Sequence, residues 1–129
     1  MEREFLAEPV WAVVGVTPDS KKFGYRVYKK LKEHGYTVYA VNPNYPEVDG
    51  DATYPGLQAV PQKPQVVNFV VNPKIGAKTL EACIELGIRK IWLQPGTVSE
   101  EILKKAAENR IQVVQNCVLA VYFPHRKPL

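Results

Sequence analysis

The stretch AVVGVTPDSKKFGYRV (residues 12–27) decides the fold that the sequence predicts. It begins as an apolar, strand-like segment, passes through a polar loop edged by Gly15 and Gly24, and ends in a basic segment with helical spacing. A strand, a loop and a helix in this order are typical of the phosphate-binding turn of α/β proteins. Gly15 would let the chain leave the strand, and Gly24 would let the helix approach it. Both are also ordinary turn residues, so the rest of the chain has to decide between the two interpretations.

Apolar, β-branched runs with little alternation recur along the chain, as is typical of strands buried on both faces of a parallel sheet. They are residues 10–16, 37–42, 66–71, 90–94 and 112–116. Amphipathic helical patterns fill most of the gaps, over residues 24–35, 72–87 and 97–109. Asn72 is predicted to cap the second of these helices, and Thr97 with Glu100 to form a capping box at the start of the third.

This alternation predicts one α/β domain over residues 1–129, a single Rossmann-like, doubly wound parallel sheet of five strands with helices on both faces. We expect the strand order 3-2-1-4-5, with the strands numbered along the chain. Residues 43–64 are predicted to form one long irregular connection. A chain of 129 residues, of which 46% are hydrophobic and 23% charged, is ordinary for one globular core.

The N-terminus, the cysteines and the net charge set further limits. Residues 1–8 lack the basic start and apolar run of a secretory signal, and no segment approaches the ~20 apolar residues of a membrane-spanning helix, so we expect a cytoplasmic protein without a membrane partner. Cys83 and Cys117 have no CxxC partner, which predicts reduced thiols and no metal site. The net charge of +4 suits a phosphate-rich ligand, a nucleic acid or solubility alone.

The loops after the strands carry the candidate ligand groups. Ligands of open α/β sheets bind beyond the carboxyl ends of the strands, where the strand order reverses, here expected between the first and fourth strands. These loops are uncharged polar or basic, with Asp19 as the exception: Thr17, Ser20, Lys21, Lys22, Asn42, Asn44, Asn72, Lys74, Gln94, Thr97 and Asn116. Because the helix after Phe23 adds unpaired amides and a positive dipole end, an anion-accepting cleft for a pyrophosphate is predicted.

A nicotinamide dinucleotide is the alternative ligand for the same crevice. A dinucleotide site normally has GxGxxG in the first turn and an acid at the end of the second strand, which binds the ribose hydroxyls. This chain has GVTPDS and then AVNPNY, with Asn42 and Pro43 where the acid would stand. An NAD(P)-dependent oxidoreductase is therefore the second prediction for this chain.

The segments VVGVTPDSKKFGYRVYKKLKEHGYTVYAVNPNY, VVNFVVNPKIGAKTLEACIELGIRKIWLQPG and VVQNC occur in an order that resembles the small CoA-binding proteins, whose fold matches the N-terminal domain of the succinyl-CoA synthetase alpha subunit. The resemblance covers nearly the whole chain. It implies that residues 17–20 wrap around the diphosphate of coenzyme A and that residues 93–96 line the nucleotide pocket. It also implies that the adenine and the pantetheine arm are bordered by Val71, Asn72, Pro73 and Ile75. The candidate cofactor-binding residues are Gly15, Thr17, Pro18, Ser20, Lys22, Gly24, Asn42, Pro43, Tyr45, Val71, Asn72, Pro73, Ile75, Gln94, Pro95, Gly96, Asn116 and Cys117.

The chain also departs from the synthetase. The synthetase has a lysine shortly after the proline of the second strand, where this chain has Asn44 and Tyr45, so a partner for the 3′-phosphate would come from Lys21, Lys22 or Lys74. The synthetase also has a second domain with a phosphorylated histidine, which we do not expect here. His34 and His125 are both interpreted as surface residues. We therefore expect a binding or regulatory module for CoA or an acyl-CoA, without ligase chemistry.

The loops predicted to surround the ligand offer few groups for acid–base or nucleophilic catalysis, since they contain no histidine. No catalytic residue is therefore predicted. Cys117 is either a small buried hydrophobe or a thiol able to form a mixed disulfide with CoA. The lysines of the first helix region could contact nucleic acid, but helical periodicity spreads them over a solvated face without interleaved aromatics, so we favour the small ligand. The C-terminal VLAVYFPHRKPL either packs on the sheet or contributes to a homodimer or to another protein interface.

Overall fold

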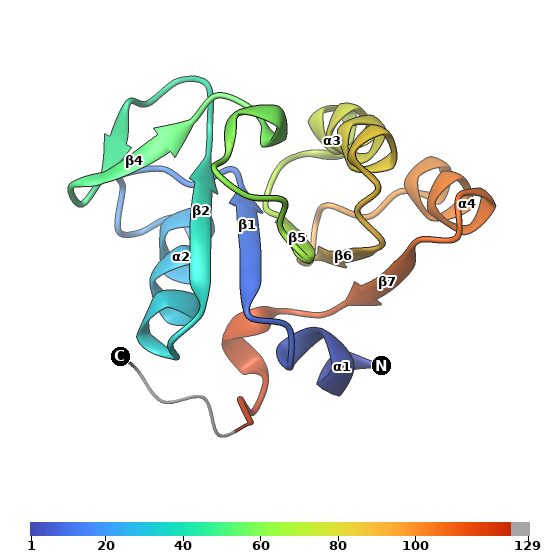
Figure 1. The fold of residues 1–129 in the computed structure, drawn as a ribbon, viewed down its shortest axis with the longest axis horizontal. Helices are drawn as coiled ribbons and strands as arrows, with labels where there is room; N and C mark the ends of the chain where they lie inside the picture. Colours follow the sequence, from blue (N-terminus) through green and yellow to red (C-terminus); the bar gives the residue numbers. More distant parts are fainter. Residues whose placement is uncertain (125–129) are drawn as a thin grey trace.

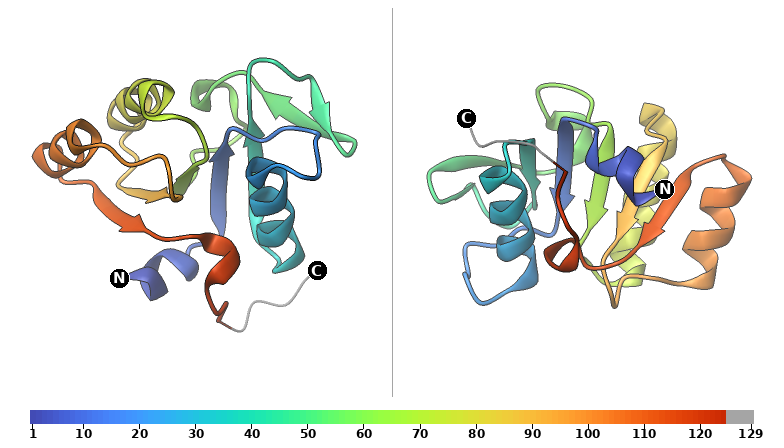
Figure 2. Two further views of the ribbon diagram at one scale, coloured as in Figure 1. Left: turned by 180° about the vertical axis from the view of Figure 1, so that it is seen from behind. Right: turned by 90° about the horizontal axis from the view of Figure 1, so that it is seen from below.

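The computed structural model describes residues 1–124, which form an open, mostly parallel sheet with helices on both faces (Figures 1 and 2). Its elements follow the chain in this order: α1 (Glu2–Leu6), β1 (Val10–Val14), α2 (Phe23–Glu33), β2 (Thr37–Val41), β3 (Glu47–Val48), β4 (Asp51–Tyr54), the 3₁₀ turn η1 (Leu57–Ala59), β5 (Val66–Phe69), α3 (Pro73–Leu86), β6 (Lys90–Leu93), α4 (Glu100–Glu108), β7 (Gln112–Gln115) and the 3₁₀ turn η2 (Val118–Ala120).

The sheet has seven strands in the order β3-β4-β2-β1-β5-β6-β7, so the prediction of five strands in the order 3-2-1-4-5 is wrong. The third predicted strand, now β5, pairs in parallel with β1, with Ala12 opposite Val67. The place expected for it, beside β2, belongs to β4, which pairs in parallel with β2 through Ala40 and Thr53. The strand order therefore reverses between β1 and β5, and not between the first and fourth predicted strands.

The missing strands lie in residues 43–64, which were predicted to be irregular. β3 and β4 form an antiparallel hairpin at one edge of the sheet, and β7 lies at the opposite edge (Figure 1). Asp49 and Gly50 form its turn, with φ angles of +52° and +82°. An Asp-Gly pair in this conformation is a strong hairpin signal, because both residues tolerate positive φ. The hairpin matters for the predicted site because residues at its base line a hollow at the carboxyl edge of the sheet.

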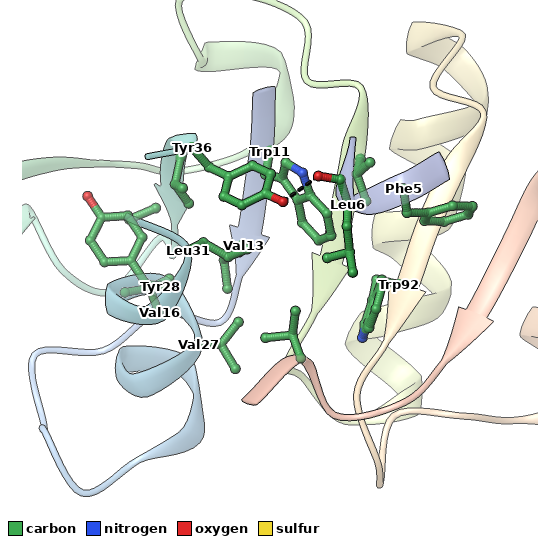
Figure 3. Packing of buried hydrophobic residues seen from close by; sticks show 14 of the residues in the cluster. Phe5, Leu6, Trp11, Val13, Val16, Val27, Tyr28, Leu31, Tyr36 and Trp92 are labelled. Carbon is green, nitrogen blue, oxygen red and sulfur yellow. Dashed lines mark hydrogen bonds between the residues drawn. The ribbon is translucent and has the colours of Figure 1, made fainter. Parts of the chain in front are cut away.

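Two hydrophobic clusters fill the space on either side of the sheet. On one side, residues of α1, α2 and η2 pack on Trp11 and Trp92, both fully buried, with their ring centroids 5.7 Å apart (Figure 3). On the other side, α3 and α4 pack on Ala12, Val67 and Phe69. Because both faces are covered, the inner strands are apolar without alternation, as parallel strands require.

The predicted helices are confirmed, with one change at their caps. Gly24, Val27, Tyr28 and Leu31 are the buried face of α2, as the spacing predicted. Asn72 caps α3 by accepting a hydrogen bond from the amide of Ile75 at 3.0 Å. The capping box of Thr97 and Glu100 is wrong, because the N-cap of α4 lies two residues later. Ser99 is its N-cap and accepts from the Ile102 amide, while the Thr97 hydroxyl donates to the carbonyl of Gln94 at 2.7 Å.

The described part of the C-terminal segment packs against α2. Val118 is fully buried in the hydrophobic cluster on the α2 side of the sheet. The ring of Phe123 stacks on that of half-buried His34, with the ring centroids 4.1 Å apart. His125, predicted to be a surface residue, lies outside the described residues. Among residues 1–124 no helix is long and apolar enough to span a membrane, and no group of His, Cys, Asp or Glu side chains is arranged to hold a metal ion.

Candidate functional site

The turn after β1 is built around the two glycines of the opening stretch. Gly15 has a φ of +106°, and a Cβ atom there would lie 2.2 Å from the carbonyl oxygen of Val70 after β5. A Cβ atom on Gly24, in the first turn of α2, would lie 2.1 Å from the carbonyl oxygen of Gly15. Such distances leave no room for a side chain at either position. The glycines therefore bring the start of α2 directly onto the point where the strand order reverses.

The loop from Val16 to Lys22 braces itself and leaves its basic end exposed. The Thr17 hydroxyl accepts from the Asp19 amide at 3.3 Å, and the Asp19 carboxylate accepts from the Lys21 amide at 2.9 Å. Ser20, Lys21 and Lys22 are exposed. Lys22 is the N-cap of α2, whose N-terminus has no side-chain cap and whose first turn has no acidic residue. Amide donors, a helix dipole and two ammonium groups therefore favour an anion here.

Asn42 joins this loop to the loop after β2. Its side-chain Nδ2 donates to the carbonyl oxygen of Val16 at 3.0 Å, and its Oδ1 accepts from the amide of Asn44 at 2.9 Å. Its own amide donates to the carbonyl oxygen of Tyr54 at the end of β4. The ends of β1, β2 and β4 are thus tied together at one half-buried residue.

Two adjoining hollows open at the same edge, with Pro43 and Pro55 in the lining of both. The apolar hollow, of about 270 Å³, lies between the ends of β1 and β2, the η1 segment and the first half of α3. It is lined by Val14, Val41, Pro43, Pro55, Gly56, Leu57, Gln58, Ile75, Lys78, Thr79 and Ala82. The polar hollow, of about 370 Å³, lies beside the hairpin and is lined by Asn42, Pro43, Asn44, Tyr45, Pro46, Thr53 and Pro55.

The first turn of α3 forms one wall of the apolar hollow. Asn72 uses its side chain to cap this helix, and Pro73 takes the first helical position. Ile75 presents a side chain that is 47% exposed, which is unusual for isoleucine, on the lining of the hollow. Val71, just before the helix, lies within 3.0 Å of the Cβ position of Gly15. The predicted residues after β1, β2 and β5 therefore come together at one edge.

The predicted residues after β6 and β7 form a separate group around η2. Gln94 is only 2% exposed; its Oε1 accepts from the Val118 amide at 2.9 Å, and its Nε2 donates to the Cys117 sulfur at 3.4 Å. Asn116 donates through Nδ2 to the Glu2 carboxylate at 2.6 Å. Among the described residues, these three line neither hollow. Pro95 and Gly96 are exposed in the turn after β6.

A polar clasp, which consists of Asp49 and Asp51 with their partners on α2, fixes the hairpin. Asp49 accepts from the Tyr25 hydroxyl at 2.6 Å and pairs with Lys29 at 3.2 Å. Asp51 accepts from the Tyr28 hydroxyl at 2.8 Å and from Lys32 at 2.5 Å. The bonds from Lys32 and then Tyr28 hold the pKa of Asp51 below its ordinary value, and those from Tyr25 and then Lys29 lower that of Asp49.

The clasp also uses two of the basic residues that a nucleic-acid interface would need. Lys29 is paired with Asp49, and Lys32 is paired with Asp51. This pairing is consistent with the interpretation of the α2 lysines as a solvated structural face.

Comparison with known families identifies the family to which this chain belongs. The family model described as a CoA binding domain matches residues 9–122, nearly the whole chain. The chain belongs to this CoA binding domain family. The resemblance predicted from its three quoted segments is confirmed.

Two proteins with sequences similar to this chain are ligases. Acetate–CoA ligase (ADP-forming) I from Archaeoglobus fulgidus is 30% identical over 129 residues, which cover 92% of this chain and 19% of that protein. The alpha subunit of acetate–CoA ligase (ADP-forming) II from Pyrococcus furiosus is 38% identical over 81 residues, covering 62% of this chain and 18% of that subunit. The chain thus spans about a fifth of the length of these relatives.

A solved structure matches the fold over most of both chains. It is a hypothetical protein from Pyrococcus horikoshii OT3, with 39% identity and a TM-score of 0.84, and the match covers 88% of this chain and 81% of that one. None of these three relatives is named as an oxidoreductase, so the comparisons give the nicotinamide alternative no support.

Several residues that line the edge of this CoA binding domain were missed from the sequence. Lys78 lies one turn beyond the predicted segment on α3, and the others belong to the hairpin and η1: Thr53, Pro55, Gly56, Leu57 and Gln58. The Asp-Gly pair at 49–50 was the available signal for the hairpin. The place of η1 against α3 had no sequence signal, because it depends on how the connection crosses the sheet edge.

Proposed function

We propose that this chain binds coenzyme A, or an acyl-CoA, at the carboxyl edge of β1, β2 and β5 as a non-catalytic binding or regulatory module. The observation that carries the proposal is the apolar hollow between Pro43, Pro55 and Ile75, which opens beside a loop built to accept an anion. A CoA molecule has the matching chemistry, because it joins a flat adenine to a diphosphate. We further propose that residues 1–129 act as one CoA-binding domain.

In this proposal the diphosphate lies against residues 17–20 and the uncapped start of α2. The adenine enters the apolar hollow, where Ile75, Leu57 and the two prolines contact its faces. Lys78, in the lining of that hollow, is a further candidate partner for the 3′-phosphate besides Lys21, Lys22 and Lys74. Lysine suits this role because its ammonium group binds phosphate as a compact point charge.

The proposed activity is limited to binding. The ligase relatives contain this region as about a fifth of their length, and their names describe those whole proteins. Asn42 stands where a dinucleotide site has its ribose acid, and its carboxamide is bonded to Val16 and Asn44. For Gln94, Asn116 and Cys117 we propose a supporting position beside η2, with Cys117 as the point nearest a CoA thiol if the pantetheine arm passes that way.

Titration calorimetry and thermal unfolding with CoA, 3′-dephospho-CoA and NAD test the proposal. A ligand that binds only the folded chain raises the unfolding midpoint, so CoA should raise it by several degrees, 3′-dephospho-CoA by less and NAD not at all. Ile75→Glu should remove the effect of CoA, since it places a carboxylate in the proposed adenine site. Tyr122→Glu, which alters a side chain that is 85% exposed and lines a groove with Met1 and Leu6, is the matched control. No response to CoA, or a larger one to NAD, would overturn the proposal.

A further inference from the structure

The bonds of Asn42 suggest a role that differs from ligand contact. Its Nδ2 reaches the carbonyl oxygen of Val16, its Oδ1 receives the amide of Asn44, and its own amide reaches the carbonyl oxygen of Tyr54. Each end of the carboxamide therefore already has a protein partner. The residue is half-buried between loops that come from three different strands.

These three loops carry different parts of the site. Val16 leads directly into residues 17–20, the proposed diphosphate loop. Pro43 lines both hollows, and Asn44 and Tyr45 line the polar one. Pro55 follows Tyr54 and lines both hollows as well. A ligand that spans the diphosphate loop and the adenine hollow needs these walls at a fixed separation.

The bond from Asn42 to Val16 is a direct side-chain link between the two walls. Gly15 donates its amide to the carbonyl oxygen of Val41, so the backbone is joined one residue earlier as well. Beyond Gly15 the loop leaves the sheet ladder; the side chain of Val16 is buried in the hydrophobic cluster, and the Asn42 side chain adds a hydrogen bond that fixes the Val16 carbonyl oxygen, from which residues 17–20 continue. Holding a binding loop in its bound position before the ligand arrives raises affinity by removing the cost of ordering it.

We infer that Asn42 is a positioning residue that latches the diphosphate loop to the adenine wall. The inference rests on the proposed CoA site for its effect on affinity, but the latch itself concerns only contacts within the chain. It also requires a hydrogen-bond donor at this position, because the partner on Val16 is a carbonyl oxygen. A carboxylate of the same shape would repel that oxygen.

Asn42→Asp tests the donor specifically. The variant keeps the volume and the acceptor for the Asn44 amide, and loses only the N–H that reaches Val16. At about pH 7.5 we expect CoA to bind roughly tenfold more weakly than to the wild type. When the pH is lowered to about 3.5, below the ordinary aspartate pKa of about 3.9, most of the carboxyl groups regain a proton that they can donate, so the ratio of the variant's dissociation constant to that of the wild type should fall toward one. An unchanged affinity, or a ratio independent of pH, would overturn the inference.

In the ligand-free protein Asn44→Asp is the matched control, because it adds the same charge to the same loop without touching the bond to Val16. Hydrogen exchange of the amides of residues 16–22 in the free proteins, corrected for intrinsic rates, supplies a readout that needs no ligand. We expect faster exchange in Asn42→Asp at about pH 7.5, recovery of the wild-type rates at about pH 3.5, and wild-type exchange in Asn44→Asp at both pH values. Equal exchange in the two variants would contradict the latch. Failure of the wild type to bind CoA would refute the proposed function instead, and the exchange comparison would still decide on the latch.

Discussion

At the scale of the residue, the site depends on two glycines that touch each other. Gly24 in α2 lies over the carbonyl oxygen of Gly15, and Gly15 in turn lies against Val70. The pair could be predicted from the sequence, since a strand, a loop and a helix with glycine at both edges require a close approach. What the sequence does not contain is the identity of the third partner, because Val70 belongs to a strand that was expected elsewhere.

Gly24→Ala tests this approach. The added methyl group would meet the Gly15 carbonyl oxygen at 2.1 Å, so the helix has to move away from the strand. We expect the free energy of unfolding to fall by about 3 kcal/mol, as measured by denaturant unfolding, and CoA binding to weaken. Gly76→Ala is the control, since its methyl group would meet the flexible end of Ile102 at 3.1 Å and the Phe69 ring at an ordinary contact distance of 3.6 Å, and we expect a change of less than about 1 kcal/mol. Equal losses in the two variants would show that the close approach is not what matters.

Cys83 illustrates how burial decides the chemistry of a single group. The side chain is fully buried among α3 core residues, and burial raises the pKa of its thiol to about 12. In a Cys117→Ala variant, where Cys83 is the remaining thiol, we expect no alkylation of the native protein at about pH 8 and full alkylation after denaturation. Mass spectrometry measures the extent of labelling. Rapid labelling of the native variant would contradict the assignment of Cys83 to the core.

At the scale of the element, the β3–β4 hairpin is the main difference between prediction and structure. It is held by only a few ladder pairs, by the buried Val48 and by the polar clasp on α2. The three longer helices, α2, α3 and α4, were predicted well because each has a long amphipathic pattern of its own, whereas the five-residue α1 was not predicted. The hairpin strands are short, and their stability comes from contacts with β2 and α2 that are distant in sequence, so residue patterning alone was too weak to reveal them.

Asp51→Asn tests the clasp. The pKa of Asp51 is lowered on folding, so its contribution to stability is present above the ordinary value of 3.8 and is lost as the pH falls through the folded value. Since both charged groups are 37% exposed, we expect the variant to be destabilised by only about 1 kcal/mol at neutral pH. The difference from the wild type should begin to shrink as the pH falls below about 4 and should disappear once the pH lies below the lowered pKa of folded Asp51. Urea unfolding at several pH values measures it, and a difference that grows toward acid pH would contradict the clasp.

At the scale of the whole molecule, the strand order decides which loops meet. The strand order reverses between β1 and β5, and this arrangement brings Ile75 and Lys78 of α3 beside Val14 at the end of β1. The residues after β6 and β7, which the sequence grouped with them, lie instead around η2. The prediction was therefore right about which edge of the sheet is polar and basic, and incomplete about which residues share a hollow there.

The salt dependence of CoA binding tests this arrangement. Lys21 and Lys22 come from the start of α2 and Lys74 and Lys78 from α3, so the proposed site attracts phosphate from two sides of the edge. Exposed charges are screened over about 10 Å at 0.1 M salt. We expect the dissociation constant of CoA to rise about fivefold between low and roughly 0.5 M salt, with a shallower rise for 3′-dephospho-CoA. Calorimetry over a salt series measures both slopes, and two equal, flat slopes would argue against phosphate recognition by lysines.

The sequence by itself determined the α/β class, the buried central strands, the buried face of α2, the Asn72 cap of α3, and the glycine turn after β1. These features follow from local periodicity and from the conformational needs of single residues, which are written in neighbouring positions. Tertiary structure alone decided the neighbour of β1, the hairpin wall, the apolar hollow and the link from Asn42 to Val16. These depend on pairings between segments far apart in the chain, where hydrogen bonding and packing energies select among arrangements that local patterns leave equally possible.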